Sequence, residues 1–237
     1  MRWPNRKTKC APGPRTSLLR SALRLLCSGA LVLAATMANA QTELSDFQSW
    51  DELDVSARVA ENVDVSWVSQ GRFSTNFSNP ATYLTGADIK IRVGPYFEVT
   101  PSYYDLGLVS VNDHRGHFRV PMLSATMRKN WVGWTIADRN RFMGAIGGGN
   151  DFWIYVNRPR VDWRVGASSM GTTLFLWDEA FYFSLFHGWT RNRFAAGARK
   201  EFGKRWAADA YYLRQDDSRI QPRDLNGLGL TLEIRLR

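Results

Sequence analysis

Alternating side chains in the last fourteen residues, 224–237, constrain the fold more than any other feature of the chain. Leucine or isoleucine occupies every second position from Leu228 to Leu236, and the residues between them are small or charged. This period of two predicts a β-strand with one aliphatic face. The aliphatic face of such a strand packs on a second layer in a soluble protein, whereas in an outer-membrane barrel it meets lipid.

The same alternation recurs from about residue 52 onward, in eleven segments separated by polar or glycine-containing turns. Single-chain bacterial barrels have even strand numbers, so we expect about twelve strands, with ten as the alternative and the error in 94–100 or 172–186. Short and long connections alternate, as periplasmic turns and extracellular loops do. The predicted fold is all-β, a single antiparallel up-and-down transmembrane β-barrel closed by the terminal strand against the first.

The first forty residues have the pattern of a secretion signal. Seven basic residues accompany an apolar stretch over 25–37, and Ala38-Asn39-Ala40 provides a small-x-small cleavage site. We expect cleavage before Gln41, which leaves 41–237 as one barrel domain. An uncleaved anchor is the alternative, but the apolar run is shorter than the ~20 residues that a spanning helix needs.

Removal of residues 1–40 changes which partners the composition favours. The formal charge of +9 falls to +2, because seven of the 31 basic residues and none of the 22 acidic ones lie in this segment. The basicity therefore gives no support for a nucleic-acid partner. Cys10 and Cys27 leave with the same segment, so disulfides and thiolate-ligated metals are excluded, and we expect no cofactor.

Three pairs of arginines with one residue between them mark the candidate site. Each pair shares one face of its strand, and an arginine facing lipid at mid-depth would cost ~2 to 4 kcal/mol, so we expect the pairs to face the lumen or a rim. Acidic partners are expected in Asp138, Asp162, Glu179 and Asp209. Two interpretations remain open: a charge network that fills the barrel, and a constriction that attracts anions. The lumen candidates are Arg139, Arg141, Arg158, Arg160, Asp162, Glu179, Arg191 and Arg193.

Catalytic and metal-binding residues are not indicated. His114 and His117 are three residues apart and so point to opposite faces of a strand. Ser110 near His114, or Ser184 near His187, could form a lipid-hydrolase pair, but no nucleophile motif surrounds either serine. We therefore expect no enzymatic activity, no catalytic residues and no metal site.

Tryptophans fall largely near the ends of the expected strands. Membrane barrels place aromatic girdles at both interfaces, which is the interpretation favoured here over packing in a sandwich core. The tryptophans concerned are Trp50, Trp67, Trp131, Trp134, Trp153, Trp163, Trp177, Trp189 and Trp206.

Several short motifs also occur in a recognisable order. They are Asp46-Phe47-x-x-Trp50, Gln70-x-Arg72, Asp113-His114-Arg115, Arg139-x-Arg141, Arg158-x-Arg160, Asp178-Glu179-Ala180-Phe181, Arg191-x-Arg193-Phe194 with Gly197, and Asp224-Leu225-Asn226-Gly227-Leu228-Gly229-Leu230. Together they resemble the bacterial family called domain of unknown function 2490, over nearly all of 41–237. The resemblance implies an outer-membrane-type β-barrel and no particular activity. One departure is that Phe142 and Met143 stand where an acidic residue near the arginine pair is expected.

The sequence thus predicts an outer-membrane barrel of a Gram-negative bacterium that is structural or a pore for small solutes. Its expected partners are outer-membrane lipid and lipopolysaccharide, the barrel-assembly machinery and small anionic solutes. The alternatives are a barrel-embedded lipid hydrolase or acyltransferase, and a soluble periplasmic β-barrel that binds ligands.

Overall fold

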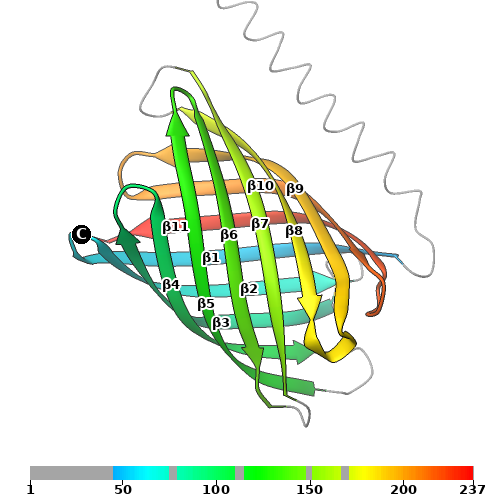
Figure 1. Ribbon diagram of the computed structural model, residues 1–237. Helices are drawn as coiled ribbons and strands as arrows, with labels where there is room; N and C mark the ends of the chain where they lie inside the picture. The colour runs from blue at the N-terminus through cyan, green and yellow to red at the C-terminus, as the bar shows by residue number, and fades with distance from the viewer. Residues whose placement is uncertain (1–44, 75–78, 110–114, 148–150, 167–170, 237) are drawn as a thin grey trace, which may run out of the picture. The chain divides into compact units, whose positions relative to one another are not determined.

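The computed structural model describes residues 45–74, 79–109, 115–147, 151–166 and 171–236, and the predicted signal peptide lies outside them. The described residues contain a closed barrel of eleven β-strands (Figure 1). Within them, no helix is long and apolar enough to cross a membrane. The strands are β1 Ser45–Ala60, β2 Val63–Ser74, β3 Asn79–Val93, β4 Phe97–Val109, β5 Arg115–Trp131, β6 Trp134–Ala145, β7 Phe152–Val165, β8 Thr172–Phe183, β9 Gly188–Phe202, β10 Trp206–Asp217 and β11 Asp224–Arg235.

The odd strand number corrects the prediction of an even one. Consecutive strands pair antiparallel, and the barrel closes between β1 and β11, as predicted, with Leu53 opposite Leu232. This closing pair is parallel, because each strand of a meander reverses direction and an odd number leaves the first and last strands pointing the same way. The count of eleven alternating segments was therefore right, and the expected error in 94–100 or 172–186 was wrong.

The two ends of the barrel differ in their connections. At one end, here called the turn end, tight turns join β1 to β2, β3 to β4, β5 to β6 and β9 to β10, and only the β7–β8 connection is longer. Gly94, Gly133 and Gly203 have positive φ in three of these turns, a conformation that residues with a Cβ rarely adopt. The opposite end, called the loop end, has the longer connections and the start of β1 (Figure 1).

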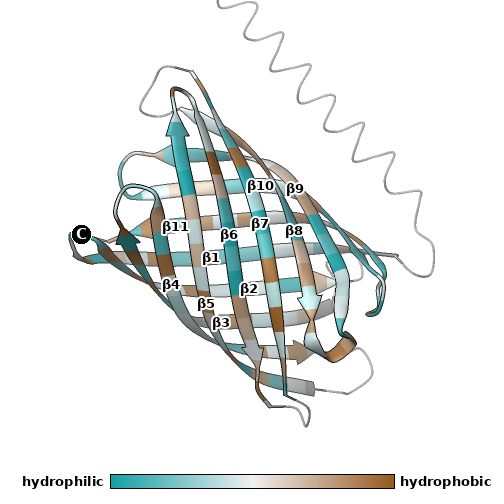
Figure 2. Cartoon of the chain, in the orientation of Figure 1, coloured by the Kyte–Doolittle hydropathy of each residue, from teal (hydrophilic) through white to brown (hydrophobic). Residues whose placement is uncertain are grey.

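Each strand has one face toward the interior and one toward the outside. On β11, Leu225 and Gly227 are buried inside, whereas Leu228 and Leu230 point outward and are each about half exposed, at 50% and 51%. The aliphatic face predicted for this strand is therefore the outward one. Figure 2 shows the same interleaving of hydrophilic and hydrophobic residues on the other strands. The outside of the barrel is thus more apolar than a soluble surface usually is.

Exposed aromatic side chains gather in two partial rings on the outward face, and Tyr103 and Phe194 lie between them. The ring near the turn end consists of Phe97, Trp131, Trp134, Trp163, Phe202 and Trp206, and the ring near the loop end consists of Phe73, Tyr83, Phe142, Trp153 and Trp189.

Three tryptophans do not fit the predicted girdles. Trp50 and Trp177 are buried inside the barrel, and Trp67 points outward near the middle of β2. Trp50 and Trp177 lie inside because they occupy the same alternate positions as the inward polar residues of their strands.

Close strand contact at Gly197 provides a test of the wall packing. A Cβ at this position would lie 2.4 Å from the Ala210 carbonyl oxygen and 2.5 Å from the Tyr211 Cβ. Gly197→Ala is therefore expected to cost on the order of 1 to 3 kcal/mol of folding free energy. At Gly71, by contrast, the nearest atom would be 3.4 Å away on the Phe73 ring. Thermal unfolding followed by circular dichroism should give Gly71→Ala a midpoint near that of the wild type and Gly197→Ala a lower one. Equal midpoints for the two variants would contradict this packing.

Candidate functional site in the barrel interior

All eight predicted lumen residues lie on inward strand faces. Four of them come together near the middle of adjacent strands, where Arg139 is opposite Arg158 and Glu179 is opposite Arg193. The other four extend the group toward both ends: Arg141 donates to Ser124 Oγ at 3.0 Å, Arg160 pairs with Asp162 at 2.8 Å, and Arg191 pairs with Asp217 at 2.6 Å.

Glu179 is the carboxylate around which the central arginines gather. Its Oε1 lies 2.9 Å from Arg139 Nη2 and 3.8 Å from Arg158 Nη1, and its Oε2 lies 3.6 Å from Arg193 Nη1. Only 6% of Glu179 is exposed. A buried carboxylate is stable in such a place because several cations and hydrogen-bond donors replace water. Thus Arg139 has an acidic partner despite the departure noted at Phe142 and Met143.

Asp138, which was expected to be another inward partner, faces outward. Its neighbour Arg139 points inward, and successive residues of a strand point to opposite faces. The Asp138 carboxylate accepts hydrogen bonds from the amides of Asn140 and Asn157 at 3.0 and 2.8 Å. The expected inward position of Asp138 is therefore wrong, because strand parity places it on the outward face.

Residues of β1 and β2 complete the site, and the sequence analysis did not select them as lumen residues. The Arg72 guanidinium lies 3.8 Å above the ring of Trp50, and that of Arg193 lies 4.8 Å from the same ring. Gln70 connects Arg72 to Glu52, because its Oε1 accepts from Arg72 Nε at 3.0 Å and its Nε2 donates to Glu52 Oε2 at 2.9 Å. The sequence does contain a pattern that indicates this part of the site. One face of β1 carries Gln48, Trp50, Glu52 and Asp54, which occupy every second position.

Electrostatic interactions link the two walls of the interior. Glu52 on β1 interacts with Arg139 and Arg158 on β6 and β7, and Arg72 on β2 interacts with Glu179 on β8. We call this group the central arginine cluster; it consists of Arg72, Arg139, Arg141, Arg158, Arg193, Glu52 and Glu179. Its five arginines face two carboxylates, so positive charge is in excess. In addition, Arg139 Nε is buried and has no hydrogen-bond partner among the described residues.

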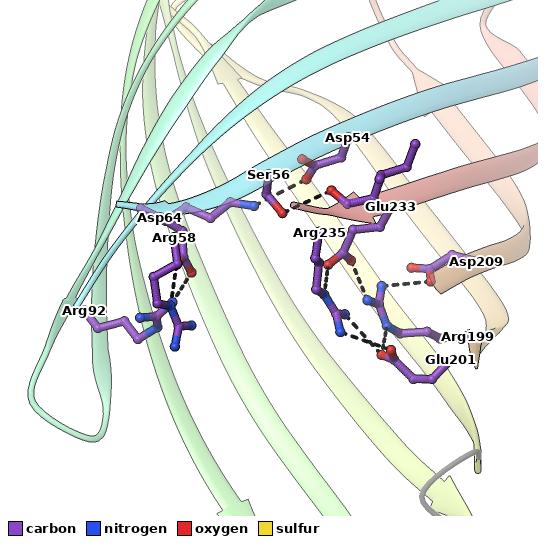
Figure 3. A network of polar contacts seen from close by, with 12 residues as sticks. Asp54, Ser56, Arg58, Asp64, Arg92, Arg199, Glu201, Asp209, Glu233 and Arg235 are labelled. Carbon is purple, nitrogen blue, oxygen red and sulfur yellow. Dashed lines mark hydrogen bonds and ion pairs between the residues drawn. The ribbon is translucent and has the colours of Figure 1, made fainter. Parts of the chain in front are cut away.

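A second charged group near the turn end has balanced charge. Figure 3 shows Arg199 between Asp209 and Glu233, and Arg235 between Glu201 and Glu233. Asp209 thus has the inward partner expected for it, at 3.0 Å. This turn-end network contains five bases and five carboxylates, namely Arg58, Lys90, Arg92, Arg199 and Arg235 with Asp54, Asp64, Glu201, Asp209 and Glu233. Of these two groups, only the central arginine cluster has more basic than acidic side chains.

Aromatic side chains pack against the arginines and narrow the interior. Arg158 lies 5.3 Å from the ring of Trp177, and Arg160 lies 4.3 Å from that of Phe175. These rings belong to a buried apolar group with Trp50, Ala195, Leu213 and Leu225. Guanidinium groups on aromatic faces keep their charge while losing conformational freedom. An excess of guanidinium groups in a narrow interior is the kind of arrangement that attracts anions.

Of the two candidate hydrolase pairs, only Ser184 and His187 lie in the described part of the chain. Ser184 begins the short 3-10 turn η1 (Ser184–Phe186) at the loop end, and its Oγ accepts the Trp153 N–H at 2.9 Å. The backbone N–H of His187 donates to the Ser184 carbonyl at 3.2 Å, and the His187 side chain is exposed. Ser110 and His114 lie outside the described residues. In the described part of the chain, no group of three or more metal-ligating side chains is arranged to hold an ion.

Comparison with known protein families gives one match. The model described as protein of unknown function (DUF2490) matches residues 47–226, which cover the strands from β1 into β11. No curated protein matches the chain.

Proposed function

The chain belongs to the DUF2490 family, and from this premise and the barrel geometry we propose that it is an outer-membrane β-barrel whose interior admits small anionic solutes. Secretion through a cleaved N-terminal signal and insertion by the barrel-assembly machinery are part of this proposal. The role is transport-like and non-enzymatic. Outer-membrane lipid and lipopolysaccharide would surround the barrel.

The two aromatic rings and the apolar band between them support the membrane location. Transmembrane barrels have an outward apolar band flanked by aromatic girdles and a polar interior, and this chain has charges inside and large hydrophobic side chains outside. A soluble binding barrel would have the opposite distribution, because exposed Trp and Leu side chains would be buried from water. The short connections at one end and longer ones at the other agree with periplasmic turns and extracellular loops.

The observation that carries the anion proposal is the charge imbalance in the central arginine cluster. Rings of arginine or lysine side chains make pores selective for anions, because a narrow passage of low dielectric strengthens the field of each charge. Here five arginines share two carboxylates, whereas the turn-end network is neutral.

Planar-bilayer recording of the purified protein tests this function. With a KCl gradient, we expect a small conductance whose reversal potential shows that chloride is more permeable than potassium. The double variant Arg139→Gln/Arg158→Gln is expected to lose most of this preference, because it removes two of the five central charges. Arg214→Gln is the matched control, because Arg214 is exposed on the outward face and pairs with Asp216. Absence of conductance, or cation selectivity in the unchanged protein, would contradict the proposal.

A further inference from the structure

A polar patch interrupts the outward face where β6, β7, β8 and β9 lie side by side. Asn157 donates to Asp138 at 2.8 Å, Asn140 donates to Asp138 at 3.0 Å, and Asn192 donates to Asp178 at 3.1 Å. We call these five residues the outward polar patch. The Tyr155 hydroxyl also donates to Asn140 Oδ1. The patch is therefore an ordered hydrogen-bonded surface.

The outward polar patch lies between the two aromatic rings. On its turn-end side Trp134 and Trp163 stack with ring centroids 5.5 Å apart, and on its loop-end side Phe142 and Trp153 stack at 5.1 Å. Along β6 the outward positions run from Trp134 through Asp138 and Asn140 to Phe142. If the rings mark the two membrane interfaces, the carboxylates lie inside the apolar band.

Neither carboxylate of the patch is neutralised within the described barrel. Asp138 and Asp178 accept hydrogen bonds from amides, and no basic side chain of the described residues pairs with them. The β7–β8 pairing is also interrupted here, between Asn157↔Ala180 and Arg160↔Trp177, at the position of Pro159, which has no N–H to donate. Ionisable side chains inside a membrane generally face a protein partner or a water-filled cavity, because hydrocarbon chains offer no hydrogen bonds.

Depth in the membrane restricts what this partner is. Soluble proteins do not reach the middle of the apolar band, and lipid chains supply no donors for the carboxylates. A second copy of the chain inserts to the same depth, because the same aromatic rings position it, and it therefore presents its own patch at the same height. A twofold axis along the membrane normal would bring the two patches together, as in most homodimers.

A second copy of the patch brings no cation, so it would support the carboxylates through amide N–H donors and not through opposite charge. A side-chain amide has two N–H donors, and the amides of Asn140 and Asn192 each use one of them within the patch. The carboxylates of Asp138 and Asp178 retain unused acceptor positions. From the proposed membrane function, the depth of the patch and these amide donors and carboxylate acceptors, we propose that two copies of the chain associate through the outward polar patch of β6–β9.

Cysteine cross-linking in isolated outer membranes tests this association. Residues 41–237 contain no cysteine, so a single introduced one reports its own surroundings. Ala180 lies between Asn157 and Asn192 in the strand register, and Ala87 is an exposed outward alanine on the distant strand β3. With a mild oxidant, Ala180→Cys is expected to form a disulfide-linked homodimer as its main product, whereas Ala87→Cys stays monomeric.

A second variant separates the patch from chance collisions. In the Ala180→Cys protein, the added changes Asp138→Leu and Asp178→Leu are expected to reduce cross-linking severalfold, while the folded barrel still migrates faster than the boiled one. A folded monomer in the membrane, equal cross-linking at positions 180 and 87, or linkage to a different polypeptide would overturn the association alone. Absence of the chain from the outer membrane would overturn the proposed function and the association together.

Discussion

Replacing Glu179 with leucine is expected to destabilise the folded barrel strongly. Glu179 is buried and is shared by Arg139, Arg158 and Arg193. Its removal leaves their charges without the nearest carboxylate, and breaking a buried ion pair in this way costs about 3 to 5 kcal/mol. Urea unfolding of the refolded protein, followed by tryptophan fluorescence, measures the loss. Glu179→Gln should lie between wild type and Glu179→Leu, because its amide oxygen can still accept a hydrogen bond.

Two further variants separate the charge effect from general damage. Asp216→Leu removes a carboxylate from an exposed pair with Arg214, and such surface pairs contribute about 0 to 1 kcal/mol. Adding Arg139→Leu to Glu179→Leu removes one of the unpaired cations and should restore part of the lost stability. If Glu179→Leu unfolded at the urea concentration of the wild type, Glu179 would not have the organising role that its contacts indicate.

Adjacent residues of β5 provide the second test with a large expected effect. Leu123 points outward and is 55% exposed, whereas Ser124 points inward and accepts a hydrogen bond from Arg141. Leu123→Asp would place a carboxylate in the apolar band, at a cost on the order of 2 to 3 kcal/mol in a membrane. Ser124→Asp would place the same charge beside a cation of the central arginine cluster. We therefore expect Leu123→Asp to lower the amount of folded, heat-modifiable protein and Ser124→Asp to leave most of it.

A higher level of folded Leu123→Asp than of folded Ser124→Asp would contradict the assignment of the outward and inward faces of β5. Equal levels of folded Leu123→Asp and wild-type protein would indicate that the outward band does not meet lipid. Because the two residues are neighbours on one strand, differences in expression or local strand propensity affect them alike. The comparison therefore tests the environment of each face of the wall.

Strand parity allowed much of the fold to be predicted from the sequence. The alternation of Leu228, Leu230 and Leu232 identifies the outward face of β11, and the spacing of Arg158 and Arg160 places both on the inward face of β7. These are local properties, because side chains two residues apart share a face in any strand. Closure against the first strand also followed, because a barrel has no free edge.

The strand number and the composition of the site depend on properties that are not local. No single segment encodes whether the number of strands is even or odd. The parallel pair of β1 and β11 forms only when the barrel closes. Arg72 and Arg193 meet at Trp50 although they are far apart in sequence. Asp138 was misplaced because the nearby arginines suggested a partner, whereas its neighbour Arg139 already occupied the inward face.

The partition of the full-length chain, expressed in a Gram-negative host, tests the central claim most directly. Cells are fractionated, the outer membranes are washed with alkaline carbonate, and the chain is detected in the washed membranes and in the periplasmic extract. We expect it in the washed outer membranes, in a form that migrates faster on gels before boiling than after. Recovery of the folded chain in the soluble periplasmic extract would contradict a barrel whose outward aromatic rings and apolar band contact lipid.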